Sequence, residues 1–390
     1  MPRKRTAGRR RPRGEGSVYE VKSEGRWRGS VSITEPDGRR RRLVVSGETS
    51  EEARAKLAEA KKAVDSGARE LHGRLTVGSY LKSWLTGHRG QVRMSTWLAR
   101  QGHINNYIDP AIGRITMRKL APSDVERMTS DMVARGLLPR TAAHARTTLR
   151  LALRDAERDA LVTRNVAALA RPPKVSRPEM QVLDGEQTRR LLAFSQDDRW
   201  HPLWQVLAGS GLRIGEALAL TWDDIDFDQA AVSVRRSLAK TGPREWGLTE
   251  PKTARSRRTV PIPATTVRAL REARARQDAE RAAAGRDWEE HPEGQPVFVD
   301  EHGRRFKSSS TNQQLDLALK RAGLPHVRLH DLRHGYASAL LAEGVPLLTV
   351  SRLLGHSSIV ITSDTYAHLT QSMTRDAAAA MGRVLGEGPE

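Results

Sequence analysis

The chain has 390 residues, of which 66 are Lys or Arg and 46 are Asp or Glu, so its formal net charge is +20. A surplus of this size attracts polyanions, which makes nucleic acid the expected partner ahead of an anionic membrane surface. The hydrophobic fraction of 38% is sufficient for packed cores. At roughly 100 to 200 residues per domain, the length predicts two or three domains and excludes a single small module.

The chain contains no cysteine, which excludes a disulfide framework, Cys-ligated zinc, iron–sulfur clusters and thiol catalysis. No apolar run approaches the roughly 20 residues of a spanning helix. The basic N-terminus is not followed by the apolar segment of a secretory signal. We therefore expect a cytoplasmic protein without membrane contacts.

The N-terminal 68 residues divide into two patterns. Residues 1–14 carry seven basic side chains and no acid, which predicts a disordered basic arm. Residues 15–68 alternate apolar and polar positions over three short stretches, with turn signals at Ser23 to Gly25 and at Pro36 to Gly38. A helical pattern then starts at Thr49. The expected structure is a βββα unit with antiparallel strands.

The middle of the chain has helical spacing. Residues 75–171 predict an all-α bundle, with N-caps at Ser95, Ser123 and Thr141 and a helix end at Gly136.

A proline-rich basic stretch, residues 172–179, is expected to be an extended linker. Residues 180–390 predict a mixed, mainly helical domain. Its expected elements are helices over 185–194 and 201–220, short strands over 231–236, 257–261 and 297–299, and further C-terminal helices. The predicted fold class is therefore multidomain α+β.

Two basic residues of the last domain are placed to meet an anion. Arg213 stands among small residues that allow a backbone phosphate to approach its guanidinium closely; the alternative is a surface ion pair with Glu216. Lys252 is expected at a turn between two strands, where it can be held in a cleft and protonate a leaving oxygen. The alternative for Lys252 is a solvated turn lysine.

Three further clusters follow toward the C-terminus. His330 and Arg333 are three residues apart, so on a helix they share a face and can reach one phosphate; the alternative is capping and ion pairing with Asp331. His356 lies just beyond a predicted helix end. Tyr366 follows polar residues close to a histidine, and its alternative is a buried tyrosine with a satisfied hydroxyl.

Taken together, these clusters resemble the tyrosine recombinase (phage integrase) family in their order and in the surrounding residues, which read SGLRIGEALALTWDDID, LHDLRHGYASALLAEG and LLGHSSIVITSDTYAHL. The resemblance is to integrases of actinobacterial-type phages or integrative elements. It implies a site-specific DNA recombinase that cleaves and rejoins strands through a 3′-phosphotyrosine intermediate. The implied catalytic residues are Arg213, Lys252, His330, Arg333, His356 and Tyr366.

The resemblance also assigns a role to each residue. Tyr366 attacks the backbone phosphate, and Arg213 and Arg333 stabilise the charge that develops on it. Lys252 protonates the leaving 5′ oxygen, His330 assists proton removal from Tyr366, and His356 hydrogen-bonds the phosphate. The reaction needs no metal and no cofactor, and the expected partners are double-stranded DNA attachment sites, a tetramer on DNA, and accessory DNA-bending or directionality proteins.

Other functions remain as alternatives. A carboxylate cluster (Asp223, Asp224, Asp226 and Asp228) is the kind of group a two-metal nuclease uses, although solvated loop acids are favoured here. A type IB topoisomerase-like nicking-closing enzyme shares almost the same site, and a non-catalytic DNA-binding regulator shares the fold.

The first two domains resemble the arm-type DNA-binding and core-binding domains of integrases. If the βββα sheet enters a DNA major groove, its DNA-binding residues are expected to be Arg26, Arg28, Arg39, Arg40, Arg41 and Arg42, which would face phosphates or base edges, and Trp27, which would position the sheet or pack against its helix.

Overall fold

The computed structural model describes residues 16–21, 25–34, 40–65, 75–176, 181–250, 256–363, 365–366, 381 and 385, without the side chains of residues 33–34, 40–41 and 62–65. The predicted basic arm, residues 1–14, lies outside these ranges. By its internal contacts the chain divides into two compact units, Met1–Ser176 and Arg177–Glu390.

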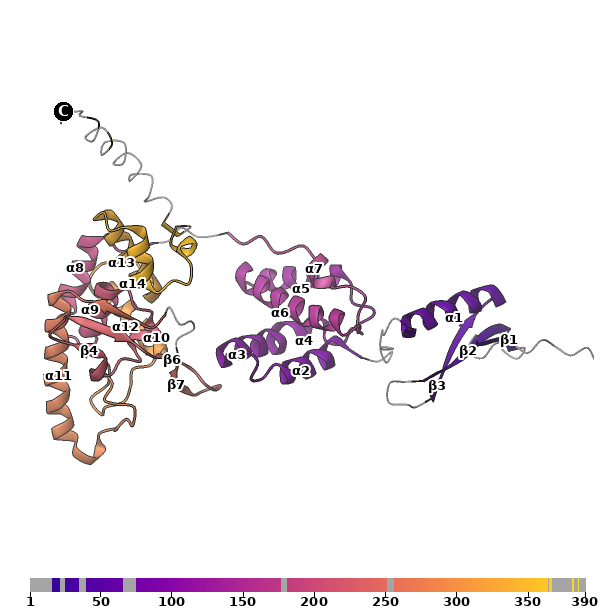
Figure 1. Cartoon of the computed structure of the whole chain (residues 1–390), viewed down its shortest axis with the longest axis horizontal. Coiled ribbons are helices and arrows are strands. Elements are labelled where there is room, and N and C mark those ends of the chain that lie inside the picture. Colours follow the sequence, from indigo (N-terminus) through magenta and orange to yellow (C-terminus); the bar gives the residue numbers. More distant parts are fainter. Residues whose placement is uncertain are drawn as a thin grey trace, which may run out of the picture. The chain divides into compact units, whose positions relative to one another are not determined.

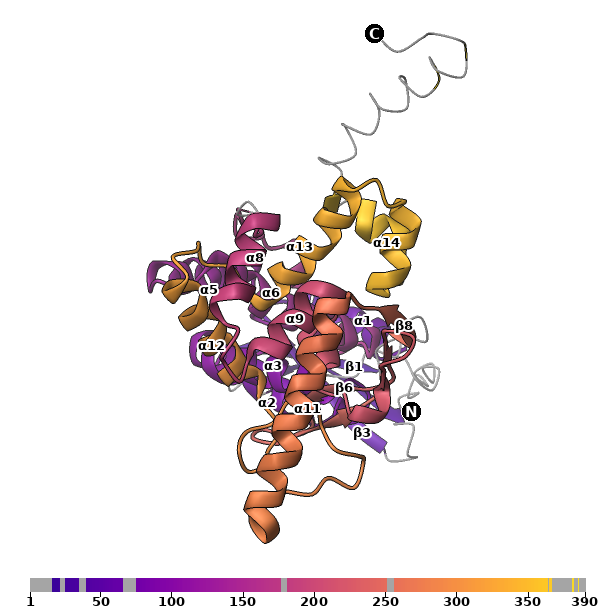
Figure 2. The same cartoon turned by 90° about the vertical axis from the view of Figure 1, so that its left-hand side faces the viewer.

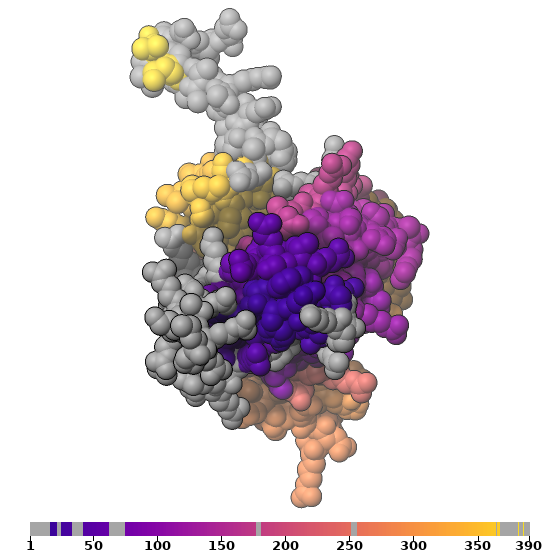
Figure 3. All heavy atoms as spheres, turned by 90° about the vertical axis from the view of Figure 1, so that its right-hand side faces the viewer, coloured from indigo at the N-terminus to yellow at the C-terminus, as the bar shows by residue number. Residues whose placement is uncertain are grey.

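The first unit begins with a three-stranded antiparallel sheet packed on a helix (Figure 1), as the alternating pattern predicted. The elements are β1 (Ser17–Val21), β2 (Arg26–Thr34), β3 (Arg40–Gly47) and α1 (Ser50–Asp65). The predicted helix start is confirmed, since the Thr49 hydroxyl accepts a hydrogen bond from the Glu52 amide at 3.2 Å. In the space-filling view the described part of this βββα unit forms one indigo body (Figure 3).

The two faces of the sheet differ in character. One face packs on α1: a Cβ added to Gly29 would lie 3.1 Å from the Ala53 carbonyl oxygen, and Val31, Leu43 and Leu57 form a small core. Strand alternation places Trp27 on this helix-facing side. Val31, Leu43 and Leu57 therefore anchor this face of the sheet to α1.

The other face of the sheet carries arginines. Strand alternation places Arg26 and Arg28 there, and the register pairs Arg42 with Ser32 on the same side. Arg42 donates a hydrogen bond to the Ser30 hydroxyl at 3.0 Å. Of the other arginines expected to contact DNA, Arg40 and Arg41 have only their backbone described, in β3, and Arg39 lies outside the described residues.

The remainder of the first unit is helical, as predicted. Its elements are α2 (Val77–Gly87), α3 (Met94–His103), a π-helical turn (Ile104–Ile108), α4 (Asp109–Ile112), α5 (Pro122–Ala134), α6 (Pro139–Arg158) and α7 (Val166–Leu169). Polar bonds join α2 to α6: the Trp84 indole donates to Asp155 Oδ2 at 2.8 Å, and the Tyr80 hydroxyl donates to the Ala152 carbonyl at 2.8 Å.

The predicted N-caps of the bundle are wrong. Ser95, Ser123 and Thr141 lie inside the first turns, because the capping positions are Arg93, Ala121 and Leu138. In α5 and α6 a proline occupies the first helical position, where its fixed φ starts the helix. The predicted end at Gly136 is correct: this residue follows α5 with φ +87°.

The second unit contains a three-stranded sheet, a hairpin and several helices. The strands are β4 (Ile225–Asp226), β5 (Ala231–Val234) and β8 (Arg258–Pro261) in the order β4–β5–β8, and the hairpin pairs β6 (Ser237–Lys240) with β7 (Trp246–Thr249). The helices are α8 (Gly185–Phe194), α9 (His201–Ser210), α10 (Ile214–Ala217), α11 (Ala264–Ala284), α12 (Ser308–Arg321), α13 (Leu329–Ala342) and α14 (Leu347–Leu354), with 3-10 turns at Trp222–Asp224 and Gly285–Asp287.

Two predictions for this unit need correction, and one element was not predicted. The helix predicted over 201–220 is interrupted at Gly211, which has φ +60°. The strand predicted over 297–299 is reduced to an isolated bridge between Val299 and Arg305. The β6–β7 hairpin, which forms a separate two-stranded sheet, was not predicted.

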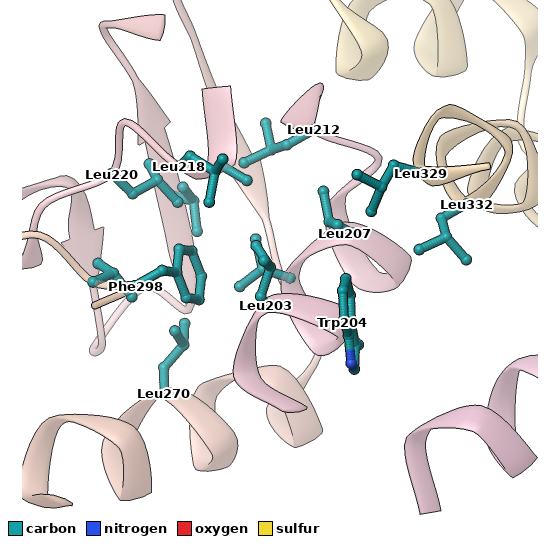
Figure 4. Close-up of a cluster of buried hydrophobic side chains, with 14 of the residues drawn as sticks. Leu203, Trp204, Leu207, Leu212, Leu218, Leu220, Leu270, Phe298, Leu329 and Leu332 are labelled. Atoms are coloured by element: carbon teal, nitrogen blue, oxygen red, sulfur yellow. The ribbon is translucent and has the colours of Figure 1, made fainter. Parts of the chain in front are cut away.

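The core of the second unit is centred on α9, which packs against α11 and α13 (Figure 2). Leu203, Trp204 and Leu207 of this helix are at most 1% exposed. Figure 4 shows them among Leu212, Leu218, Leu220, Leu270, Phe298, Leu329 and Leu332. This packing fixes the segment between α9 and α10, and with it the backbone of Arg213.

Candidate active site

The turn between α9 and α10 positions the first predicted site residue. Gly211 ends α9 in the left-handed region, and a Cβ there would lie 2.4 Å from Cδ1 of Tyr336, so a residue without a side chain is required. Two residues later, Arg213 occupies the N-cap position of α10. The helix break that the sequence did not predict therefore directs the Arg213 side chain away from the core.

The buried carboxylate of Glu216 binds this arginine. The carboxylate accepts hydrogen bonds from the Arg213 amide (3.1 Å) and guanidinium (2.8 Å) and from the Arg258 guanidinium (2.9 Å). Burial of this 3%-exposed carboxylate favours its neutral form, but the charges of Arg258 and Arg213 outweigh burial and lower the pKa of Glu216. The ion pair expected as the alternative role of Arg213 therefore exists, and it orients the arginine, whose side chain keeps 39% exposure.

Arg258 links three segments of this region. It begins β8, donates through Nη2 to Glu216, through Nε to the Leu353 carbonyl at 2.5 Å, and through Nη1 to the Ser256 carbonyl at 3.0 Å. Its side chain is 8% exposed. Arg258 therefore ties α10 and β8 to the end of α14.

Arg333 is buried on α13 and completes the same framework. Its Nη1 donates to the Gly211 carbonyl at 2.7 Å and its Nη2 to the Leu354 carbonyl at 2.6 Å. Burial, and to a smaller extent the nearby charge of Arg213, lower the pKa of Arg333 to about 9. The side chain therefore stays charged at neutral pH. Nη2 of Arg213 lies 3.5 Å from the Gly355 carbonyl, so both guanidiniums reach consecutive carbonyls at the end of α14.

His356 follows directly. Gly355 ends α14 with φ +63°, as predicted, and presents His356 beyond the helix. His356 Nδ1 lies 2.8 Å from the Thr362 hydroxyl. Burial and then the charges of Arg333 and Arg213 lower the pKa of His356 to about 4, so this imidazole is neutral at neutral pH.

The histidines of α13 occupy two positions. His330 lies at the exposed surface in the first turn, and its ring meets the ring of His334 edge-on at 4.7 Å. Partial desolvation and the charge of Arg333 lower the pKa of His330. Asp331 does not pair with either predicted residue; its carboxylate caps the helix by accepting from the amide and guanidinium of Arg328.

Tyr366 is 1% exposed and packs with Ala337, Leu341, Val350 and Leu354. Its hydroxyl lies 2.8 Å from His334 Nδ1. Burial raises the pKa of Tyr366 to about 12, although the nearby charge of Arg333 acts in the opposite direction. The predicted nucleophile is therefore protonated and hydrogen-bonded in the DNA-free protein.

The predicted proton donor, Lys252, lies outside the described residues, between the end of β7 at Thr249 and the start of β8 at Arg258.

Among the four aspartates of the carboxylate cluster, Asp224 has a structural role. Asp224 is 3% exposed, accepts from the Thr221 amide and hydroxyl at 3.1 Å, and pairs with Arg236 at 2.8 Å. The expectation of solvated loop acids is wrong for this residue, because its carboxylate caps the 3-10 turn. Across the ranges that the structure describes, no three His, Asp or Glu side chains gather so as to hold a metal ion.

Sequence reasoning missed two residues of this site: Arg258, which binds Glu216 and the Leu353 carbonyl, and His334, which contacts Tyr366. Glu216 was expected only as an alternative ion-pair partner of Arg213, three residues away on one helical turn. The Arg258 contacts join positions far apart in the chain, and nothing local to the sequence indicates them.

None of the helices in the described part is long and apolar enough to span a membrane.

Comparison with known protein families gives two matches. Residues 181–373 match the model of the phage integrase family, and residues 76–133 match the N-terminal SAM-like domain of phage integrases. The first match contains all six predicted catalytic positions, and the second covers part of the helical bundle.

Among curated proteins, the chain is 29% identical over 401 residues to an integrase of Streptomyces ambofaciens, covering 98% of this chain and 99% of that protein. It is also 29% identical to a XerC-like tyrosine recombinase of Caldanaerobacter subterraneus, covering 90% and 95%. The likeness to these two relatives extends over nearly their whole lengths.

Solved structures show the same fold. The Tn1549 transposon integrase in complex with transposon right end DNA matches with a TM-score of 0.68 at 22% identity, covering 80% of this chain and 100% of that chain. A lambda integrase dimer bound to a core site matches with a TM-score of 0.56 at 17% identity, covering 92% and 96%.

Proposed function

The chain belongs to the phage integrase family, and we propose that it cuts and rejoins DNA strands with Tyr366 as the nucleophile. It is a site-specific DNA recombinase of the tyrosine type. The observation that carries the residue assignment is the convergence of Arg213 and Arg333 on consecutive carbonyls at the end of α14, beside His356.

The arginines supply the electrostatic part of the mechanism. A phosphodiester gains negative charge on its non-bridging oxygens as the nucleophile attacks, and fixed guanidiniums stabilise that charge by hydrogen bonds of defined geometry. Arg213 is partly exposed while Arg333 is buried behind it. Glu216 holds Arg213, and the Gly211 and Leu354 carbonyls hold Arg333, before DNA arrives, so little reorganisation is needed in the transition state.

The other residues move protons and conserve the bond. Tyr366 forms a 3′-phosphotyrosine ester, and Lys252 protonates the leaving 5′ oxygen. His356, neutral at neutral pH, donates a hydrogen bond to the phosphate through the ring nitrogen that does not contact Thr362. His330 assists proton removal from Tyr366. A second strand's 5′ hydroxyl reverses the steps, so the cycle requires no metal and no cofactor.

The partners that we propose are double-stranded attachment sites and further copies of the chain. The Tn1549 integrase has been solved on transposon DNA and the lambda integrase as a tetramer on a Holliday junction, which supports assembly of this chain into a tetramer on DNA. We propose that it acts in the cytoplasm. The arginine-bearing face of the βββα sheet, with Arg26, Arg28 and Arg42, is the surface that we propose for distal arm sites; accessory bending or directionality proteins complete the proposal.

A nicked suicide substrate tests the proposed chemistry. After cleavage of such a substrate the short 5′-hydroxyl fragment diffuses away, so the covalent complex accumulates. Wild-type protein should form the complex, and Tyr366→Phe should bind the same DNA without forming it. A protein that binds attachment-site DNA but never becomes linked to it would be a regulator and not a recombinase.

A further inference from the structure

The hydroxyl of Tyr366 contacts a histidine to which the assigned mechanism gives no role. His334 Nδ1 lies 2.8 Å from the Tyr366 hydroxyl, and the two ring centres are 5.9 Å apart. His330, to which the mechanism gives the assisting role, meets His334 edge-on at 4.7 Å. The order of the three side chains is therefore Tyr366, His334, His330, running from the core toward the surface.

His334 is in the state that a proton acceptor needs. Burial and then the neighbouring His330 lower its pKa to about 4, with Arg333 and Arg328 acting in the same direction and Asp331 against them. At neutral pH the imidazole is consequently neutral, and one ring nitrogen carries a lone pair. With Nδ1 in that form, the Tyr366 hydroxyl donates to it.

We propose that His334 is a catalytic residue whose Nδ1 takes the proton of Tyr366 directly during strand cleavage, while His330 assists through its ring contact with His334. This inference rests on the proposed function. As the Tyr366 oxygen bonds to phosphorus, its proton passes to His334 Nδ1, the bond from phosphorus to the 5′ oxygen breaks, and that oxygen takes a proton from Lys252. On rejoining, the 5′ hydroxyl attacks the phosphorus and gives its proton to Lys252, the bond from phosphorus to the Tyr366 oxygen breaks, and His334 returns the proton to that oxygen, so protons and bonds balance over the cycle.

The charges around His334 explain why the transfer belongs to the DNA-bound state. The groups that face the imidazole are His330, Asp331, Arg333 and Arg328 from α13 and its cap, together with Tyr366; His356, beyond α14, lies near enough to respond to it. In the free protein the cations among them disfavour an imidazolium. A phosphodiester bound to Arg213 and Arg333 adds negative charge and offsets those cations, which makes proton uptake by His334 more favourable.

Substitution of His334 by Asn separates proton transfer from positioning. The Asn side-chain oxygen can occupy the place of Nδ1 and accept the same hydrogen bond, but it cannot take up a proton. His334→Asn should form the covalent complex about 100-fold more slowly at neutral pH, a loss typical of removing a general base. His334→Ala should be at least as slow. His326→Asn is the matched control, because His326 is exposed and pairs with Asp316.

Two measurements distinguish a lost base from a damaged fold. The cleavage rate of His334→Asn should rise with pH toward the pKa of Tyr366, and a fluorotyrosine of lower phenol pKa at position 366 should restore much of the rate. His334→Gln serves in the same assays if the Asn variant shows a lowered thermal midpoint. A misfolded site would not be rescued by an acidified phenol, so absence of rescue in both variants overturns the proposal.

Cleavage by His334→Asn within about threefold of wild type would also overturn it, leaving His334 only a positioning residue. That result leaves the proposed function intact, provided that wild-type protein is linked through Tyr366. Failure of wild-type protein to link to the suicide substrate at all would instead refute the proposed function.

Discussion

Replacing Glu216 with Gln tests whether the buried carboxylate organises the arginines. The substitution keeps the shape of the side chain but removes the charge that lies between Arg213 and Arg258. In the native protein three hydrogen bonds of 2.8 to 3.1 Å end on this carboxylate. In the variant an amide group would face one of the two guanidiniums, and both would lose their counter-charge.

The expected cost follows from burial. Removing one partner of a buried ion pair costs roughly 3–5 kcal/mol, and because Gln keeps one acceptor oxygen we expect about 3 kcal/mol. With a urea slope of about 3 kcal/mol/M, the unfolding midpoint of the second unit should fall by about 1 M. Cleavage should fall at least about tenfold, since Arg213 loses the bonds that orient it.

Urea unfolding followed by tryptophan fluorescence measures the first effect, and the exposed Glu186→Gln on α8 is the matched control. The pKa of Glu216 also predicts the direction in which this stabilisation changes with pH. The pKa of Glu216 is held below its ordinary value of 4.5, so its stabilisation is fully present above about pH 4.5 and is lost as the pH falls through the folded-state pKa. The difference in urea unfolding midpoint between wild type and Glu216→Gln should therefore become smaller at acidic pH. Equal midpoints for the two proteins at pH 7 would refute this reasoning.

Three further results are expected. Arg213→Lys should slow covalent complex formation about 100-fold although the charge is kept, because an ammonium cannot reproduce the planar fork; near-normal cleavage would reduce Arg213 to an ion-pair partner of Glu216. Cleavage should persist in excess EDTA without nucleotide, and loss in EDTA with recovery in Mg²⁺ would restore the carboxylate alternative. Protein lacking residues 1–68 should still cleave a short core site while binding distal sites more weakly and with a flatter salt dependence; loss of linkage despite core binding would contradict the modular interpretation.

The sequence predicted those elements that depend on neighbouring residues in the chain. The alternation of apolar and polar residues predicted the three N-terminal strands. Gly136 and Gly355 indicated helix ends because glycine, which has no Cβ, adopts the left-handed conformation at a helix end without strain. The interruption at Gly211 was missed, since its cause is the contact of a distant residue, Tyr336, with the glycine. The caps at Ser95, Ser123 and Thr141 were wrong because prolines or neighbouring residues set the start of each helix.

The candidate site was predictable as a set of residues but not as a geometry. Each cluster taken alone also had a structural interpretation, and their order together with the surrounding residues indicated a recombinase. The structure adds that several alternatives are also true: Arg213 does pair with Glu216, and Tyr366 is indeed a buried tyrosine with a satisfied hydroxyl. The contacts of Arg258 and His334 depend on tertiary packing, which spacing alone does not encode.

The most direct test of the central claim is to locate the covalent bond. Wild-type protein trapped on a nicked suicide substrate is digested with nuclease and protease, and the peptide that carries the residual nucleotide is sequenced by mass spectrometry. We expect a 3′-phosphotyrosine ester on Tyr366 and no adduct in Tyr366→Phe. An adduct on Tyr336 or any other residue, or linkage that survives in Tyr366→Phe, would contradict it.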